Sequence, residues 1–389
     1  MSAQGPEGSF GIYVHWPFCL AKCPYCDFNS HVSRAVDHDA WRKALAAEMR
    51  HMRGLTGPRR LESVFFGGGT PSLMAPATVA ALIDEADGLW GLAGDAEITL
   101  EANPTSVEAG KFADYAAAGV NRLSLGVQAL TDADLKVLGR MHSVAEAEAA
   151  FEVARAAFPR VSIDLIYARM GQTTAAWEAE LARALTMAVD HLSLYQLTIE
   201  PGTRFGELYD LERLKVPADD VAAEMYALTQ SMTAAAGLPG YEVSNHARPG
   251  AESRHNLIYW RCGDYAGIGP GAHGRLTLAD GRRLATVTAP APGDWLAAVA
   301  GKGHAVVEET PVERRDQATE YMLMAMRLAE GADLARYEQI AGTPVDAARI
   351  AGLAGDGLVR RNCRRGGDRL AVTARGRIVL NRILAELLA

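Results

Sequence analysis

Over its first 240 residues the chain alternates short apolar segments with longer helical patterns, and this alternation constrains the fold more than any other feature. Amphipathic segments separate six strand-like segments, at 11–16, 63–66, 96–103, 120–128, 161–167 and 191–198. Strand–helix units in succession predict a parallel sheet, because parallel neighbours need a crossover that is usually a helix. The full length of 389 residues leaves room for a second domain.

Polar and glycine-rich residues follow the ends of these strand-like segments. They include a cluster of cysteines and the runs GGGTP, EANP and GVQ. A parallel barrel gathers the loops that follow its strands at one end, and the sites of such barrels lie there. We therefore predict an α/β fold built on a barrel, or part of one, with the site at the C-terminal ends of its strands.

The pattern changes in the last third of the chain. An Ala/Pro/Thr-rich run, ATVTAPAPGDW, predicts a connection or surface loop near 280–310. Three helical segments, a short strand pair and a final helix follow, and this order is typical of a winged-helix-like domain. We expect three parts: a barrel at 1–240, a linking segment at 241–300 and a mostly helical C-terminal domain at 301–389.

Charge and composition exclude several classes of function. The 39 Lys and Arg residues against 47 Asp and Glu residues give a net charge of −8, which predicts no general attraction to nucleic acid or anionic lipid. An arginine cluster (Arg360, Arg361, Arg364 and Arg365) fits a solvated hairpin better than a DNA-binding surface. We find neither a secretory signal nor an apolar run long enough to span a membrane. The sequence predicts a cytoplasmic protein with at most peripheral membrane contact through its partners.

Three of the five cysteines form a C-x3-C-x2-C run: Cys19, Cys23 and Cys26. Structural zinc and ordinary iron–sulfur clusters usually take four protein ligands. Three thiolates on a four-iron cluster leave one iron open to a small molecule. A zinc site completed by His15 or His31, or incidental clustering, is the alternative. A zinc knuckle would sit in a small module rather than at the start of a long strand–helix array, so we favour a [4Fe–4S] cluster.

Further candidates follow successive strands. The glycines of GGGTP (67–71) let the backbone approach a ligand closely, or they form a plain strand-to-helix turn. Glu101 and Gln128 each end a strand, where they could bind polar ligand groups or simply face solvent. Asp164 is flanked by apolar residues, so it needs a polar partner, and Arg140 is a candidate partner for a carboxylate or a ligand. Their position on successive strands favours a common site.

Taken in order, the cysteine run, GGGTP, EANP, SLGVQ, LGRMH and DLIY resemble the coproporphyrinogen III dehydrogenase (HemN)-like radical SAM family, from about residue 10 to the C-terminus. The resemblance implies a partial (β/α)6, TIM-like barrel, with S-adenosylmethionine (SAM) chelated by the open iron of a [4Fe–4S] cluster. It implies the following SAM-binding set: Tyr13, Gly68, Gly69, Thr70, Glu101, Gln128, Arg140 and Asp164.

Two details indicate which branch of that family the chain resembles. The dehydrogenases carry a fourth cysteine where this chain has Phe28, and their extension ahead of the cysteines is short here. Both differences match the HemW branch of heme chaperones, whose heme motif HNxxYW is similar to HNLIYW at 255–260. By that resemblance the heme contacts are His255, Asn256, Tyr259 and Trp260.

Two alternatives stay open for this motif. It could be a strand with an aromatic core face and an incidental histidine, and the thiolate of Cys262 could compete with His255 for iron. The resemblance favours a protein that binds heme and passes it to respiratory apo heme proteins, rather than an enzyme. Oxidative decarboxylation of coproporphyrinogen III, or another radical SAM modification of a tetrapyrrole, is the alternative. GIGPGA at 267–272 resembles a dinucleotide-binding loop only loosely, and we expect a tight loop at the barrel mouth.

Overall fold

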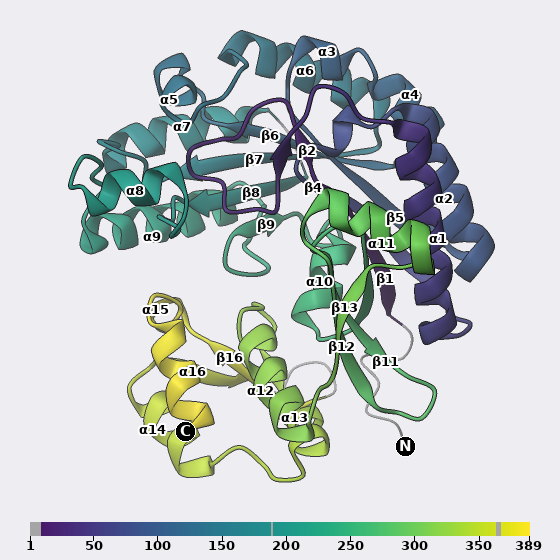
Figure 1. Cartoon of the computed structure of the whole chain (residues 1–389). Helices are drawn as coiled ribbons and strands as arrows, with labels where there is room; N and C mark the ends of the chain where they lie inside the picture. Colours follow the sequence, from purple (N-terminus) through teal and green to yellow (C-terminus); the bar gives the residue numbers. More distant parts are fainter. Residues whose placement is uncertain (1–8, 188–189, 363–366) are drawn as a thin grey trace.

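The computed structural model describes residues 9–187, 190–362 and 367–389 (Figure 1). Its main feature is an eleven-stranded sheet with the order β13-β12-β11-β10-β1-β4-β5-β6-β7-β8-β9. Six consecutive parallel strands form the centre: β1 (Phe10–Trp16), β4 (Leu61–Gly68), β5 (Leu92–Ala102), β6 (Arg122–Gln128), β7 (Arg160–Tyr167) and β8 (His191–Gln196). The six predicted strand–helix units are therefore present, and the predicted partial barrel is confirmed.

Helices cover the outer face of this sheet (Figure 1). They are α1 (His38–Thr56), α2 (Pro76–Trp90), α3 (Ser106–Ala109), α4 (Phe112–Ala117), α5 (Asp132–Val137), α6 (Val144–Ala157), α7 (Thr174–Thr186), α8 (Arg204–Asp210) and α9 (Asp219–Ala235). Alternate residues of a strand point to opposite faces. In β1, Trp16 accordingly packs against Trp41 of α1, whereas Tyr13 stacks near Phe65 on the inner face. The outer face is thus the apolar core, and the inner face is left for polar side chains.

Residues 236–311 extend the sheet at both ends. They form β9 (Asn245–Ala247), α10 (Arg254–Trp260), β10 (Asp264–Ile268), β11 (His273–Thr277), β12 (Arg283–Thr288), α11 (Pro292–Lys302) and β13 (Val306–Pro311). β10 is parallel to β1, and β11 to β13 continue antiparallel.

The loop predicted near 280–310 was wrong, because this segment contains two strands and a helix. Alternate residues of β12, including Leu284 and Thr286, are buried, and Pro292 occupies the first turn of α11, where its missing N–H costs nothing. The Ala/Pro-rich composition therefore marked a helix start. Residues 269–272 do form the expected tight loop, and Pro270 accepts a hydrogen bond from the Asn29 side chain of the cysteine loop at 3.0 Å.

A buried carboxylate ties this extension to α1. Glu48 accepts hydrogen bonds from the backbone N–H groups of Gly269 (2.7 Å) and Ala305 (2.8 Å) and from Trp295 Nε1 (3.0 Å). Burial raises the pKa of Glu48 to about 7, although these three donors act in the opposite direction.

The C-terminal domain has its own apolar core, which includes Tyr321, Met322, Leu353 and Ile383. It comprises α12 (Arg314–Ala325), β14 (Ala332–Asp333), α13 (Leu334–Ala341), α14 (Ala347–Gly355), β15 (Val359–Asn362), β16 (Arg369–Val372), α15 (Ala374–Arg377) and α16 (Leu380–Leu388), with β14, β16 and β15 in one sheet. This order matches the predicted winged-helix-like unit. Arg364 and Arg365 of the arginine cluster lie outside the described residues.

Within the described ranges, no helix is both long enough and apolar enough to cross a membrane.

Candidate functional site

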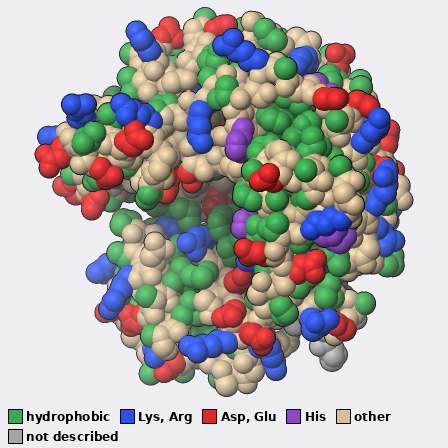
Figure 2. All heavy atoms as spheres, viewed as in Figure 1, with side chains coloured by type: hydrophobic (Ala, Val, Ile, Leu, Met, Phe, Trp, Pro, Cys, Tyr) green, Lys and Arg blue, Asp and Glu red, His purple; other side chains and the backbone are tan. Residues whose placement is uncertain are grey.

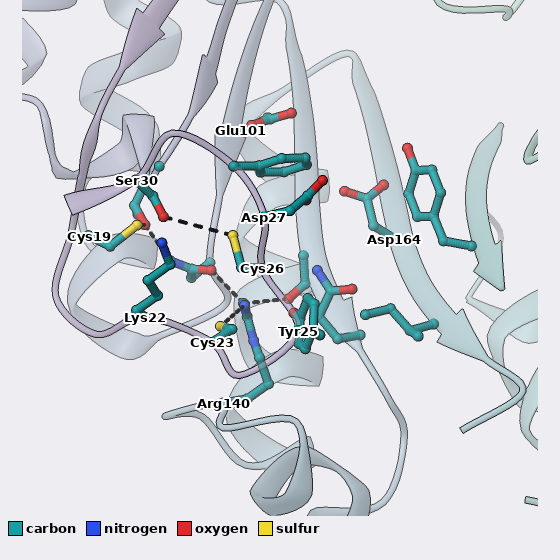
Figure 3. Close-up of a pocket in the computed structure, with 18 of the residues that line it drawn as sticks. Cys19, Lys22, Cys23, Tyr25, Cys26, Asp27, Ser30, Glu101, Arg140 and Asp164 are labelled. Carbon is teal, nitrogen blue, oxygen red and sulfur yellow. Dashed lines mark hydrogen bonds between the residues drawn. The ribbon is translucent and has the colours of Figure 1, made fainter. Parts of the chain in front are cut away.

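A cavity of about 360 Å³ opens at the C-terminal ends of the parallel strands. Figure 3 shows the three sulfurs of the cysteine loop on one side of the cavity, with the carboxyl groups of Glu101 and Asp164 away from them. The cavity lining includes Cys19, Cys23, Cys26, Gly68, Gly69, Thr70, Glu101, Gln128, Arg140 and Asp164. The structure thus brings the three cysteines and all predicted SAM-binding residues except Tyr13 to one place.

The cysteine loop holds its sulfurs next to hydrogen-bond donors. Thr70 donates its hydroxyl to Cys19 Sγ at 3.3 Å, and Arg140 donates Nη1 to Cys23 Sγ at 3.4 Å. Cys26 Sγ lies 3.8 Å from the Ser30 hydroxyl. Burial raises the pKa of Cys19 and of Cys26, so ionising these thiols needs compensation of the kind that a metal supplies. The donor set fits an iron–sulfur cluster held by three thiolates.

The two histidines of the zinc alternative make other contacts. His15 Nε2 lies 2.8 Å from the backbone oxygen of Asn29, and His31 Nε2 lies 3.0 Å from the side-chain oxygen of the same residue. Both imidazoles therefore support the shape of the cysteine loop through Asn29.

The GGGTP segment brings backbone close to the cysteine loop. Gly68 has a φ of 111°, a conformation that other residues rarely adopt, and its N–H donates to Glu101 Oε2 at 3.3 Å. A Cβ at Gly69 would lie 2.8 Å from the backbone oxygen of Phe18. Gly68 is thus required by its backbone conformation, and Gly69 by the close approach of β4 to the loop.

Two half-buried carboxyl groups form one wall of the cavity. Burial and the neighbouring Asp164 raise the pKa of Glu101 to about 8. Burial also raises the pKa of Asp164, although Ser124 donates its hydroxyl to both carboxylate oxygens at 3.1–3.2 Å. Carboxyl groups held in this way can accept hydrogen bonds from ligand hydroxyls, or donate one when protonated.

Arg140 connects the cysteine loop to the strand ends. In addition to Cys23, its guanidinium donates to Asn103 Oδ1 at 2.5 Å and to the backbone oxygen of Gly126 at 3.1 Å. The Asn103 side chain in turn donates to Thr70 Oγ1 at 3.4 Å. A positive charge fixed beside the sulfurs favours anionic ligand groups here.

The cavity lining also includes polar residues that the sequence analysis did not single out. Asn103, Ser124 and Tyr195 line the cavity; Asn103 follows β5, Tyr195 is near the end of β8, and Ser124 lies within β6. Their alternation with apolar residues along the strands was the signal that could have found them. Tyr13 lies off the cavity lining, and its hydroxyl donates to His15 Nδ1 at 3.1 Å.

HNLIYW forms α10, so the alternative reading as a strand was wrong. Ser253 caps the helix by accepting from Asn256 N. The helix lies against the inner face of the sheet, where its residue His255 stacks on Phe65 with a centroid distance of 4.8 Å. The motif therefore lies inside the barrel, nearer the N-terminal ends of the strands than the cavity.

Both ring nitrogens of His255 are hydrogen-bonded. Nδ1 lies 2.7 Å from the Ser63 hydroxyl, and Nε2 lies 2.6 Å from the Tyr259 hydroxyl. Burial lowers the pKa of His255 to about 3, so the imidazole is neutral. A neutral imidazole is the form that ligates iron, but the described contacts engage both of its nitrogens.

A buried acid holds the start of α10 in place. Glu97 Oε1 accepts from the backbone N–H groups of Arg254 (3.0 Å) and His255 (3.4 Å) and from the Ser253 hydroxyl (3.3 Å). Its other oxygen accepts from Arg160 Nη1 at 2.6 Å. A carboxylate at a helix N-terminus is favourable because it meets free N–H groups and the positive end of the helix dipole.

The other residues of the motif lie between the barrel and the C-terminal domain. Asn256 donates its amide to the Tyr241 hydroxyl at 3.2 Å, and the Arg327 guanidinium lies over the ring of Trp260 at 6.0 Å. Cys262 is buried in the C-terminal core, where burial raises its pKa to about 11. The Cys262 thiol is therefore protonated at neutral pH in this environment.

The sequence of this chain is similar to those of several known proteins. The radical SAM superfamily model matches residues 13–183. Escherichia coli "Heme chaperone HemW" is 37% identical over 97% of this chain and 98% of its own length. The mitochondrial mouse protein "Radical S-adenosyl methionine domain-containing protein 1" is 43% identical over 87% of this chain and 77% of its own length. The chain belongs to the HemW family of radical SAM proteins.

Among solved structures, E. coli coproporphyrinogen III oxidase HemN, described as a radical SAM enzyme, superimposes with a TM-score of 0.79. It covers 99% of this chain and 91% of its own at 24% identity, which establishes a shared fold. The radical SAM family implies a [4Fe–4S] cluster and SAM, in agreement with the three thiols and the polar cavity wall. In this HemW-family chain, Phe28 lines the same cavity and is 60% exposed.

Proposed function

We propose that this protein binds heme and passes it to apo heme proteins, on a scaffold that carries a [4Fe–4S] cluster and SAM. The observation that carries the proposal is the near full-length likeness to E. coli "Heme chaperone HemW". The chain shares with that branch the motif HNLIYW, and it has Phe28 at the position of the fourth cysteine of the dehydrogenases.

In this proposal Cys19, Cys23 and Cys26 hold the cluster, because their sulfurs line one cavity beside the donors of Thr70 and Arg140. The remaining cavity residues bind SAM: Gly68, Gly69 and Thr70 through backbone and hydroxyl groups, Glu101 and Asp164 through carboxyl groups, and Gln128 and Arg140 through their polar ends. When bound, the cluster supplies one-electron chemistry at its open iron. Tyr13 would act indirectly, since its hydroxyl reaches the cysteine loop through His15 and Asn29.

Heme would bind at α10, with His255 as iron ligand and Asn256, Tyr259 and Trp260 as further contacts. Because His255 Nε2 and the Tyr259 hydroxyl are 2.6 Å apart, iron can reach this nitrogen only if Tyr259 turns away. Loading heme at this nitrogen therefore requires the Tyr259 side chain to move. The acceptors in this proposal are respiratory apo heme proteins, which the protein reaches from the cytoplasm.

The test is a heme titration of the anaerobically reconstituted protein, followed by its Soret absorption. We expect saturable binding by the unmodified protein and a shifted, weaker Soret band for His255→Ala. Phe65→Ala is the matched control, because Phe65 belongs to the same ring stack but cannot ligate iron.

Absence of stoichiometric heme binding by the unmodified protein would refute the proposed function. Equal loss in the two variants would refute only the ligand role of His255, since it would indicate disrupted packing.

A further inference from the structure

A hollow separates the barrel from the C-terminal domain. In Figure 2 it is a deep notch between the two lobes, with basic side chains on the wall formed by the lower lobe. Figure 1 shows that α9 and β9 lie on one side of this notch and α12 and α15 on the other. The positive charge of Arg377 of α15 acts to lower the pKa of Tyr226 of α9 and of His246 of β9, on the opposite side of the notch (Figure 1).

Two arginines of the C-terminal domain lie side by side at this hollow. Arg377 Nη1 donates to the backbone oxygen of Arg327, and the Arg327 guanidinium lies 6.0 Å from the centre of the Trp260 ring. Both side chains are half-buried, and desolvation lowers the pKa of Arg327. Arg327 thus lies over an aromatic ring of α10, and Arg377 lies next to Arg327.

Neither arginine makes an ion pair with a carboxylate in the described part of the chain. The acid that acts on Arg327, Glu242, is engaged elsewhere: its oxygens accept from the backbone N–H groups of residues 243–245 and from the Asn245 amide. Partly buried cations are costly unless they are paired. Among the described residues the two guanidinium groups donate to backbone oxygens, of Leu323 and Arg327, and neither has a carboxylate within ion-pair distance.

The chemistry of the lower wall points to one kind of ligand. Two neighbouring guanidinium groups, one of them over an aromatic ring, suit a flat apolar ligand that carries carboxylates on one edge.

We propose that Arg327 and Arg377 bind the two propionates of heme, with the macrocycle against Trp260. A tetrapyrrole of this kind has an apolar plane and two carboxylates on one side, which matches the chemistry of the hollow. Guanidinium groups bind carboxylates through parallel N–H donors, so they also set the orientation of the ring. The inference rests on the proposed heme-binding function and identifies the part of the C-terminal domain that takes part in it.

The experiment compares heme with its dimethyl ester, which keeps the macrocycle and iron but has no carboxylates. We titrate the unmodified protein, Arg327→Gln and Arg377→Gln with both ligands. Arg375→Gln is the matched control, because Arg375 belongs to the same short helix but is exposed. Arg327 and Arg377 form the proposed propionate clamp, and Arg327→Gln and Arg377→Gln are the clamp variants. We expect each clamp variant to bind heme about ten-fold more weakly, which corresponds to about 1.4 kcal/mol per lost charged contact.

The dimethyl ester should bind the unmodified protein at least ten-fold more weakly than heme, and the clamp variants should discriminate less between the two ligands. Heme binding that is unchanged in both variants, together with equal affinity for the ester, would overturn the clamp while leaving heme binding intact. Failure of the unmodified protein to bind heme would overturn the proposed function and the clamp with it. The ester comparison uses the unmodified protein, so the test holds even if a variant does not fold.

Discussion

Glu97 is the residue whose replacement most directly tests how α10 is held. Its carboxylate is 3% exposed and accepts from Arg160 at 2.6 Å and from the first N–H groups of α10 at 3.0–3.4 Å. Glu97→Gln keeps the size of the side chain but removes the charge. It also places an N–H2 donor opposite either Arg160 or the N–H groups of the helix.

Breaking a buried ion pair by removing one partner costs about 3–5 kcal/mol. Part of this loss of free energy destabilises α10, because Glu97 accepts hydrogen bonds from two backbone N–H groups in its first turn. If the free energy of local opening of α10 falls by about 3 kcal/mol, its amide hydrogens should exchange about 100-fold faster. The reason is that about 1.4 kcal/mol changes the opening equilibrium ten-fold. We would follow peptides that cover 253–260 by hydrogen–deuterium exchange and mass spectrometry.

The same strand supplies a matched control. Asp95 pairs with Arg254 of α10 at 2.7 Å but is exposed, so Asp95→Asn should leave exchange in α10 unchanged. Exchange in Glu97→Gln that equals that of the unmodified protein would refute the view that Glu97 anchors the helix. Equal acceleration of hydrogen exchange in both variants would refute the view that the contact of buried Glu97 with α10 is stronger than that of exposed Asp95.

Three further predictions concern other parts of the molecule. Gly69→Ala should weaken SAM binding in equilibrium dialysis, because its Cβ would lie 2.8 Å from a backbone oxygen, whereas Gly54→Ala, which meets no atom within 4 Å, should leave it unchanged. Cys26→Ser should lower the iron and sulfide content of the reconstituted protein, and Cys262→Ser should not, because Cys262 lies in the C-terminal core. Because burial raises the pKa of Glu48 from 4.5 to about 7, the folded protein binds the extra proton between these values. The free energy of unfolding should therefore fall by up to about 3 kcal/mol as pH rises from 5 to 8, and Glu48→Gln should flatten this slope in urea titrations. An unchanged slope in Glu48→Gln would contradict this prediction. Loss of SAM binding in both glycine variants would contradict the first prediction, and equal iron in both cysteine variants would contradict the second.

The fold was predictable where sequence pattern and packing agree. The six central strands are apolar on their outer face and follow one another with helices between, so periodicity alone located them. The segment near 280–310 was not predictable in this way. Ala and Pro at the start of α11 resemble a loop until Pro292 is known to occupy the first turn of a helix.

The site was predictable to the extent that it lies at strand ends. Glu101 and Gln128 share the cavity because parallel strands end at one edge, as the strand pattern implied, and Asp164 joins them from within β7. Contacts between residues far apart in the sequence left no local pattern from which they could be predicted. The engagement of both nitrogens of His255 by Ser63 and Tyr259 depends on how α10 lies against the inner face of the sheet, and no local pattern specifies that packing.

The most direct test of the account is heme transfer. The protein is reconstituted anaerobically with its cluster and SAM, loaded with one equivalent of heme, and mixed with an apo-cytochrome, and the Soret band of each protein is followed after separation. The account predicts that heme binds stoichiometrically and moves to the acceptor. Heme that never binds, or a protein that instead decarboxylates coproporphyrinogen III with SAM, would contradict it.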